Sequence, residues 1–373
     1  MKIAHVSTFP ETRCGIACYA ADLIDSMPRL SHEKYALHYG VNMTRNTAGH
    51  ADVKKREELR KLAKQISVSD CSAVCLQHEF GIWGGTNGEN IYYFMDQIRK
   101  PVISTLHTTM NRNEDNKSRM EILENLIRKS ILTFVLSRYS KDTLCKNMTD
   151  IGSKIAVVPH GVPKIVYKPP AMGKKGTMTW KFCTIGFLKQ KKGLEKVLVS
   201  IMELIKAGHN IKYVIAGSSQ PQFAVQKLFP DELRNMIKDL GLSKNVKIVE
   251  KFLTRGEQIK LIQESHAGIF AYQKQGQASS GTIPLVLAGG RPVICTPFEF
   301  ALAKKEEIGD LIIVADDYSS EAIAGGILNI IEGEDKYIIN AEKLSKKTET
   351  WLWKNVGKTY EEAFKLCKKL LTT

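Results

Sequence analysis

The sequence lacks the features of a membrane-spanning or disulfide-bonded protein. No stretch approaches the ~18–20 consecutive apolar residues that a bilayer-spanning helix needs, and the first residues enter a strand pattern directly, without a signal peptide. The eight cysteines form no C-x-x-C pair, and several lie inside apolar, strand-like runs. This usage is typical of buried thiols in a reducing compartment rather than of disulfides or a zinc site, so we expect a cytoplasmic protein.

Acidic side chains are scarce relative to basic ones. The chain has 39 Asp and Glu against 54 Lys and Arg, which gives a formal charge of +15. Such a charge suits nucleic acid, an anionic membrane or an anionic substrate as the partner. The basic residues are spread over both halves, and no basic tail or Arg/aromatic run of the kind that grips bases is present. Nucleic acid is therefore the least favoured of the three partners, and we expect none.

Strand-like and helix-like segments alternate along most of the 373 residues, a length that favours two domains. The alternation predicts parallel sheets covered by helices on both faces, that is, two doubly wound Rossmann-like domains. Prolines, glycines and lysines cluster between 166 and 179, where the periodicity is lost. We predict an N-terminal domain over 1–165, a linker over 166–179, a second domain over 180–350 and a C-terminal helix over 351–373 that crosses back to the first domain.

The stretch from Ile269 to Pro297 predicts a strand, a polar loop, a short helix and a second strand. The helix is expected over Thr282–Ala288, with Ser279 or Ser280 as its N-cap. A helix that starts at the carboxyl end of a parallel strand offers free backbone N–H groups and a positive dipole end to a phosphate. An ordinary strand-to-helix turn that binds nothing is the equally weighted alternative.

Three other strand ends carry candidate site residues. His78 and Glu79 follow one buried strand and precede Gly84-Gly85, although a buried histidine beside a surface glutamate is an equal alternative. His107 follows the next strand. The loop after Phe187 carries Lys189, Lys191 and Lys192, which in isolation predict a solvated surface. A ligand that meets loops of both domains would lie in the cleft between them.

Taken in order and at their spacing, these segments resemble the large retaining glycosyltransferase family four, whose members have the GT-B fold. The segments that carry the resemblance are Cys14-Gly15-Ile16-Ala17, His78-Glu79-Phe80-Gly81 with Gly84-Gly85, Thr105-Leu106-His107-Thr108, Val158-Pro159-His160-Gly161-Val162, Gly186-Phe187-Leu188 ahead of Lys192-Gly193, and Gln277 to Gly281 ahead of Ala288-Gly289-Gly290-Arg291-Pro292-Val293. The similarity covers nearly the whole chain.

The resemblance implies transfer of a sugar from a nucleotide diphosphate to an acceptor hydroxyl, with retention at the anomeric carbon. The expected catalytic residues are His107 at the sugar face, Lys192 at the diphosphate and Gln277 at a sugar hydroxyl. Further donor contacts are expected from Gly15, Gly186, Lys189, Tyr272, Ser279, Ser280, Gly281 and Thr282, and acceptor contacts from His78, Glu79 and Trp83. Metal-dependent relatives on another fold use a D-x-D motif, which is absent here, so we expect no metal or cofactor and a diphosphate stabilised by the protein's own cations and dipoles.

Three positions depart from the family pattern. The family's E-x7-E motif is Gln277 and Leu285 here, and Leu285 has no carboxylate for the ribose hydroxyls. The arginine that often follows the glycine at Gly186 is Phe187, with Lys189 or Lys191 as the alternative cation. The expected protein is a metal-independent transferase that uses a UDP- or GDP-linked sugar and a glycan or glycolipid acceptor, loosely associated with an anionic membrane. The alternatives are an inactive or weakly active scaffold of the same fold, or a sugar-nucleotide epimerase or a phosphorylase.

Overall fold

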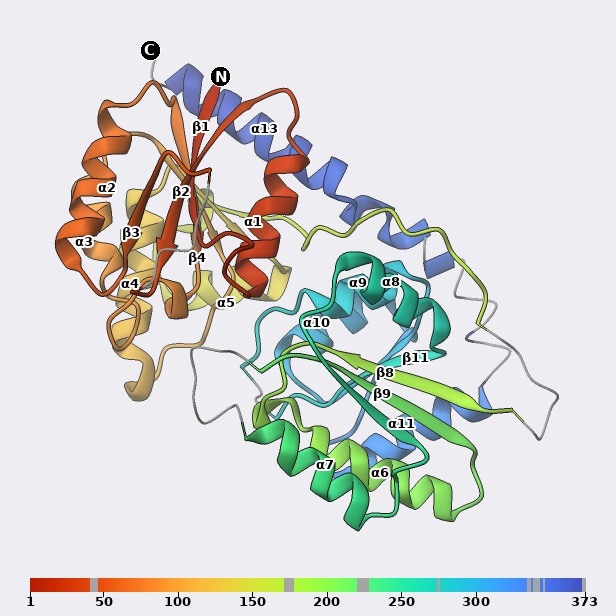
Figure 1. The fold of residues 1–373 in the computed structure, drawn as a ribbon. Helices are drawn as coiled ribbons and strands as arrows, with labels where there is room; N and C mark the ends of the chain where they lie inside the picture. Colours follow the sequence, from red (N-terminus) through yellow and green to blue (C-terminus); the bar gives the residue numbers. More distant parts are fainter. Residues whose placement is uncertain are drawn as a thin grey trace. The chain divides into compact units, whose positions relative to one another are not determined.

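The computed structural model describes residues 1–40, 46–170, 178–219, 228–273, 276–333, 337, 343–344 and 346–370. The chain divides into two compact units. Unit 1 comprises Met1–Gly161 together with Trp351–Thr373, and unit 2 comprises Val162–Thr350. Each unit contains one parallel sheet with helices on both faces, so the prediction of two doubly wound domains is confirmed (Figure 1).

The sheet of unit 1 has seven parallel strands in the order β3-β2-β1-β4-β5-β6-β7. Its strands are β1 (Lys2–Ser7), β2 (Ser31–His38), β3 (Gly49–Asp52), β4 (Ala73–His78), β5 (Val102–Leu106), β6 (Leu132–Val135) and β7 (Ile155–Val157). The residues of β1, β4 and β5 are almost entirely buried, because helices cover both faces of the sheet. The carboxyl ends of β4 and β5 are adjacent, since His78 pairs with Leu106.

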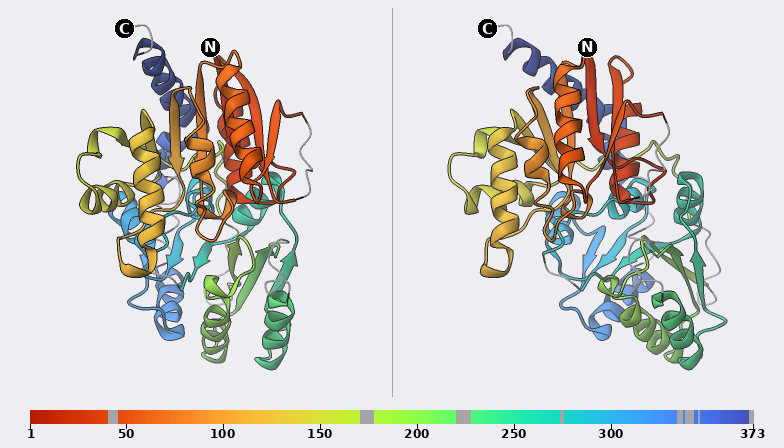
Figure 2. Two further views of the ribbon diagram at one scale, coloured as in Figure 1. Left: turned by 90° about the vertical axis from the view of Figure 1, so that its left-hand side faces the viewer. Right: turned by 60° about the vertical axis from the view of Figure 1, so that its left-hand side comes forward.

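The helices of unit 1 divide between two apolar layers. These helices are α1 (Gly15–Asp25), α2 (Arg56–Val68), α3 (Ile91–Met95), α4 (Lys117–Lys129), α5 (Arg138–Asn147) and α13 (Trp353–Leu370). Helices α1 and α13 cover one face, and α2, α3 and α4 cover the other (Figures 1 and 2). The C-terminal helix therefore belongs to the core of unit 1 although 189 intervening residues form unit 2 (350 − 162 + 1).

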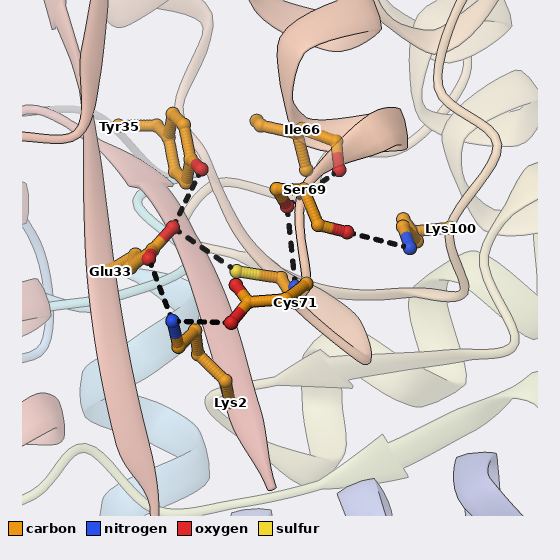
Figure 3. A network of polar contacts seen from close by, with 8 residues as sticks. Lys2, Glu33, Tyr35, Ile66, Ser69, Cys71 and Lys100 are labelled. Carbon is orange, nitrogen blue, oxygen red and sulfur yellow. Dashed lines mark hydrogen bonds and ion pairs between the residues drawn. The ribbon is translucent and has the colours of Figure 1, made fainter.

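A polar network ties the amino end of β1 to β2 and to the segment before β4 (Figure 3). The Lys2 ammonium lies 3.1 Å from a Glu33 carboxylate oxygen and 2.7 Å from an Asp70 carboxylate oxygen. The second Glu33 oxygen accepts from the Tyr35 hydroxyl at 2.8 Å, and the Cys71 thiol contacts the same oxygen at 3.4 Å. This network lies at the opposite end of the strands from the residues that the sequence marks as functional.

The sheet of unit 2 has six strands among the described residues, in the order β10-β9-β8-β11-β12-β13. Its strands are β8 (Trp180–Ile185), β9 (Ile211–Gly217), β10 (Val246–Glu250), β11 (Ala267–Phe270), β12 (Val293–Cys295) and β13 (Ile312–Val314). Its helices are α6 (Leu194–Lys206), α7 (Phe229–Asp239), α8 (Arg255–Glu264), α9 (Thr282–Ala288), α10 (Glu299–Ile308) and α11 (Ser320–Glu332). Helices α6, α7 and α11 lie on one side of this sheet, and α8 and α9 lie on the other (Figure 1).

Two elements were missed by the sequence analysis, and one was overextended. Strand β3 and helix α10 show no clear hydrophobic periodicity in the sequence. The sequence pattern predicts a helix over Glu89–Arg99, whereas the structure has a helix only over α3. The pattern also predicts a helix over Val53–Ile66, but α2 begins at Arg56, because Val53 N–H still donates to the His38 carbonyl at 3.0 Å. Four predicted segments lie partly outside the described residues. They are the strand predicted to end at Val41, the linker at 171–177, the helix predicted to begin at 222 over 222–227, and the C-terminal helical run over 338–342.

Candidate functional site

The Lys192 side chain of unit 2 lies against the face of an aromatic ring. Lys192 ends a short 3-10 turn (Gln190–Lys192) between β8 and α6, and its Nζ is 3.5 Å from the centroid of the Tyr272 ring. The two loops that carry these residues also share a backbone hydrogen bond, from Gln273 N–H to the Lys191 carbonyl at 3.0 Å. A cation held over the π-face of a tyrosine is attracted by the ring quadrupole and stays ordered without a carboxylate partner.

Tyr272 is itself fixed from three directions. Its ring stacks on Phe298 with centroids 4.8 Å apart, and its carbonyl accepts from the Thr296 hydroxyl at 2.7 Å. Its hydroxyl lies 3.3 Å from Ser280 Oγ and 3.5 Å from Thr282 Oγ1. The structure therefore brings four sequence-predicted donor residues together in one cluster: Lys192, Tyr272, Ser280 and Thr282.

Gly193 explains why Lys192 can take this position. Gly193 has φ +63, a left-handed conformation that favours glycine, and a Cβ there would lie 2.1 Å from the Ala271 carbonyl oxygen. The turn after Lys192 thus packs directly on the backbone that leads into Tyr272. The sequence assigns Gly193 no role beyond its place in a motif. A glycine between a strand and a helix was nevertheless a signal for this close packing.

The loop before α9 is closed by its own contacts. The Gln277 side-chain amide donates to the Ser279 carbonyl at 2.8 Å, and the Gln277 carbonyl accepts from Phe300 N–H at 3.1 Å. The N-cap position is Gly281 rather than Ser279 or Ser280. Ser280 Oγ nevertheless accepts from Ile283 N–H at 3.4 Å, which is the kind of contact that a capping serine makes. In the part of the chain that the structure describes, Gly281 and Thr282 N–H donate to no protein acceptor.

The remaining donor positions of unit 2 lie around the end of β8. Gly186 has φ +148, and its carbonyl oxygen would lie 1.7 Å from a Cβ at Gly217, so the two strand ends approach closely. Lys189 lies with Nζ 5.6 Å from the Phe187 ring centroid, over a different ring from Lys192. Leu285 has no polar side-chain group, and at 2% exposure in α9 its side chain is not accessible to a ligand.

In unit 1, His107 is buried beside Gln77. Its Nε2 lies 2.8 Å from Gln77 Oε1, and the edge of Tyr19 packs against its ring with centroids 4.7 Å apart. Burial, with smaller effects of His160 and His78, lowers the pKa of His107 to about 3. The imidazole is therefore neutral at physiological pH. Gln77 and Tyr19 were missed by the sequence analysis, because each lies within a run that reads as ordinary core.

The expected acceptor residues lie near the same strand ends but differ in exposure. His78 and Trp83 are fully buried, and the Trp83 indole donates to the Gln77 carbonyl at 3.1 Å. Glu79 is half-buried and accepts a hydrogen bond from the Thr108 hydroxyl. Gly15 opens α1, where Cys14 Sγ accepts from Ala17 N–H at 3.2 Å. The acceptor roles stay predictions, and Glu79 is the one of the three side chains that reaches solvent.

The described residues contain one group of three side chains spaced like metal ligands: Glu33, Asp70 and Cys71. The Lys2 ammonium already contacts both carboxylates of this group, which places a cation where a metal would sit (Figure 3). Among the described helices, none combines the length and apolar character needed to cross a bilayer.

Comparisons with known proteins follow this architecture. Residues 171–351 match the family described as glycosyl transferases group 1. No curated protein matches the sequence. The family match covers the segment that contains Lys192, Tyr272 and the loop before α9.

Solved structures resemble the chain over its whole length. HepE from Anabaena, in complex with UDP and glucose, has a TM-score of 0.77 at 13% identity and covers 98% of this chain and 99% of its own. Sucrose-phosphate synthase from Thermosynechococcus elongatus has a TM-score of 0.74 at 12% identity, with coverage of 99% and 100%. A glycosyltransferase from Rickettsia africae ESF-5 has a TM-score of 0.72 at 14% identity, with coverage of 99% and 98%. The GT-B fold predicted from the sequence is confirmed.

Proposed function

We propose that this chain is a glycosyltransferase with the GT-B fold that transfers a sugar from a UDP- or GDP-linked donor, with retention, and the match of residues 171–351 to group 1 glycosyl transferases supports this. UDP is the favoured nucleotide, because the similar HepE structure contains UDP and glucose. The proposed acceptor is a hydroxyl of a glycan or a glycolipid.

The cluster of Lys192, Tyr272, Ser280 and Thr282 carries the proposal. A diphosphate leaving group needs positive charge and hydrogen-bond donors that are already in place when the bond to the sugar breaks. Lys192 supplies the charge, and the Ser280 and Thr282 hydroxyls and the backbone N–H groups of Gly281 and Thr282 supply the donors. Helix α9 has only seven residues, so we assign the larger share of the attraction to the ammonium group.

Other residues complete the proposed donor site. Gln277 and His107 would hydrogen-bond sugar hydroxyls, and Lys189 would replace the arginine that the family often has at Phe187. Gly15, Gly186 and Ser279 would let the backbone approach the phosphates. With Leu285 buried, the ribose hydroxyls must be bound by another group or left to solvent. On the acceptor side, Glu79 is the proposed contact, with His78 and Trp83 supporting it from the core.

We propose that no metal ion takes part. The cationic and hydroxyl groups of the cluster provide the charge stabilisation that a metal supplies to diphosphates elsewhere. Transfer rates measured with and without EDTA test this directly. Equal rates are expected, and a loss of activity that Mg²⁺ or Mn²⁺ restores would contradict the proposal.

A glycolipid acceptor would place the protein at an anionic membrane. The charge of +15 and the basic helices α2 and α4 favour such a peripheral association. Co-sedimentation with vesicles containing an anionic lipid, compared with neutral vesicles, is expected at low salt and should fade as the salt rises. Equal sedimentation with both kinds of vesicle would remove this part of the proposal.

A non-catalytic scaffold is the second candidate, favoured by Leu285 and Phe187. Thermal shift with UDP, GDP and uridine separates the two candidates. A nucleotide at ~100 times its dissociation constant should add about 2.7 kcal/mol to the stability, and uridine, which lacks phosphates, should add little. Single-turnover hydrolysis of the matching UDP- or GDP-glucose then distinguishes a transferase from a scaffold that only binds, and the absence of any nucleotide shift would reject the transferase.

A further inference from the structure

Arg119 lies against an aromatic ring at the edge of unit 1 where β4 and β5 end. It is the third residue of α4, the helix that follows β5 along the chain, and its guanidinium carbon is 5.3 Å from the centroid of the Phe80 ring. Phe80 comes directly after Glu79, the proposed acceptor contact. A cation over an aromatic face is attracted by the ring quadrupole, so this contact orders the Arg119 side chain beside the loop that follows β4.

The same loop fixes the guanidinium from a second direction. Arg119 Nε–H donates to Asn87 Oδ1 at 3.0 Å, and the Asn87 amide nitrogen donates to Ser118 Oγ at 3.0 Å. Gly88 keeps this part of the loop close to Phe80, because its φ is +85 and a Cβ there would lie 2.8 Å from the Phe80 carbonyl oxygen. The position of Arg119 is therefore set by two contacts with one tightly packed loop.

The charge of Arg119 is not neutralised by a carboxylate of the described residues. Arg112 and Arg128, by contrast, share Glu124 at 3.0 and 2.8 Å. Glu89, in the loop before α3, accepts from two backbone N–H groups of that loop at 3.1 and 2.8 Å. Arg119 is half-buried, and within the part of the chain that the structure describes its Nη groups donate to no acceptor. The guanidinium thus keeps its charge and its fork of N–H groups for an anion.

We propose that Arg119 binds an anionic group, a carboxylate or a phosphate, on the acceptor. The planar guanidinium matches both groups, since each presents two oxygens that accept parallel hydrogen bonds. The anion site rests on the contacts of Arg119, whereas its assignment to the acceptor rests on the proposed function. The acceptor class is thereby narrowed from any glycan or glycolipid to one whose glycosylated end is acidic, such as a uronic acid residue or a sugar phosphate.

The two charged residues beside Phe80 suit different groups of one acceptor. Glu79 accepts from the Thr108 hydroxyl, and its carboxylate suits a neutral sugar hydroxyl but repels an anion. Arg119 lies over the ring of the next residue, where its positive charge attracts an acidic group. The formal charge of +15 adds a general attraction for acidic acceptors, which fades as the salt rises.

Binding of small sugar probes to the full chain tests the site without a donor. Glucuronate carries a carboxylate, glucose-6-phosphate carries a phosphate, and methyl glucoside is the neutral counterpart. Saturation-transfer NMR titrations should show at least one anionic probe binding more tightly than methyl glucoside, and Arg119→Gln should weaken that probe about tenfold or more. The probe that loses affinity identifies the group. Equal binding of all three probes to the wild type would overturn the proposal.

Matched variants distinguish Arg119 from the other cations. Arg128→Gln changes an arginine of the same helix that pairs with Glu124, so it should leave the probes unaffected. Arg119→Lys keeps the charge without the planar fork and should bind with intermediate affinity, which gives a second measurement if Arg119→Gln is unstable. Lys192→Met should also leave the probes unaffected. A loss in Lys192→Met with none in Arg119→Gln would place the anion at the donor cluster and overturn the proposal.

A failure of this inference can be told from a failure of the proposed function. Titration of Arg119→Gln with UDP should match the wild type, because the donor cluster belongs to unit 2. A chain that binds the acidic probes through Arg119 but binds no nucleotide would keep the anion site and lose the transferase. A chain that binds UDP, and whose probe affinities are unchanged in Arg119→Gln, would lose only the acidic acceptor.

Discussion

Among the described residues, Lys192 is the cation that lies nearest to the centroid of an aromatic ring. Many surface lysines and arginines of the structure contact a carboxylate, whereas Lys192 lies on the Tyr272 ring and forms no ion pair with the described residues. An aromatic face orders an ammonium group without neutralising it. The charge therefore remains available to an anion.

Replacing Lys192 with Met tests this charge at similar side-chain length. Loss of a charge-assisted hydrogen bond should weaken UDP binding by about 1.5–3 kcal/mol, or roughly 10- to 150-fold, with little change in thermal stability. Isothermal titration with UDP measures the effect. Lys206→Met removes an exposed charge at the far end of α6, the helix that follows Lys192, and should leave the affinity unchanged. Equal affinities for the two variants would place the diphosphate elsewhere.

The burial of His78 makes the stability of the folded chain depend on pH. Its ring is fully buried, neither ring nitrogen has a hydrogen-bond partner within the described residues, and burial lowers its pKa to about 3. Between pH 6.5 and 3 the unfolded chain binds a proton at this site and the folded chain does not. Stability must therefore rise with pH through this window and fall on acidification.

Replacing His78 with Leu should remove this acid sensitivity. Between pH 7 and pH 5 the wild type should lose about 2 kcal/mol of unfolding free energy because of His78, and the leucine variant should not show this loss. At pH 7 the variant should be at least as stable as the wild type, since two unpaired polar atoms leave the core. Urea unfolding at both pH values measures the difference. His209→Gln in unit 2 is the control, and a variant with the wild-type dependence on pH would show that His78 is not the titrating group.

At the scale of elements, the turn between β8 and α6 depends on a single glycine. Gly193→Ala places a Cβ 2.1 Å from the Ala271 carbonyl and strains φ +63, so we expect a loss of about 1–3 kcal/mol and weaker UDP binding as Lys192 is displaced. Thermal denaturation and titration measure the two effects. Gly241→Ala is the matched control, because φ is +70 there but no atom lies within 4 Å of the new Cβ. Gly241→Ala should lower the stability without changing the affinity for UDP. An equal loss of UDP affinity in both glycine variants would show that the position of Lys192 does not determine UDP binding.

The elements with strong local signals could be predicted from the sequence. The sequence pattern predicts a helix over Arg255–Glu264 in addition to the one over Thr282–Ala288, and the two agree with α8 and α9 residue for residue. A Thr254 capping box opens the first helix, and Gly289-Gly290 ends the second. Strand β3 could not be predicted, since its four residues have little β-propensity and form a strand through pairing with β2. In α10, Lys304 is buried and breaks the amphipathic pattern.

The site was predictable as a set of loops but not as a set of contacts. Parallel strands end at one edge of their sheet, which identified the loops after β8 and β11. The contact of Lys192 with Tyr272 joins residues 80 positions apart (272 − 192), and no local pattern encodes it. Gln77 shows the same limit, because its partner His107 follows a different strand, β5.

At the scale of the whole molecule, the last helix completes the first unit. On α13, the Tyr360 hydroxyl lies 2.6 Å from Thr105 Oγ1 and 3.2 Å from the Tyr19 hydroxyl. Trp353, at the start of the helix, packs edge-on against Tyr19 and so closely on Gly161 that a Cβ there would lie 2.3 Å from its ring. The core of unit 1 therefore includes side chains that follow unit 2 in the sequence.

Deleting residues 351–373 should destabilise unit 1 and spare unit 2. The deletion exposes the part of one sheet face that α13 covers and removes buried side chains such as Val356, Tyr360 and Phe364, at about 1.5–3 kcal/mol each. Hydrogen exchange is expected to accelerate in β1 and β5 while β8 and β11 keep their protection. This selectivity is the test, because a helix that merely ended the chain would affect neither sheet.

Two point variants on α13 test the same prediction if the truncated chain does not fold. Tyr360→Phe keeps the ring but removes the hydroxyl that contacts Thr105 and Tyr19, so unit 1 should lose about 1–3 kcal/mol. Leu366→Ala alters an exposed position on the same helix and should change little. Equal acceleration of exchange in both sheets after Tyr360→Phe would mean that the two units unfold together. The prediction that only unit 1 depends on α13 would then be wrong.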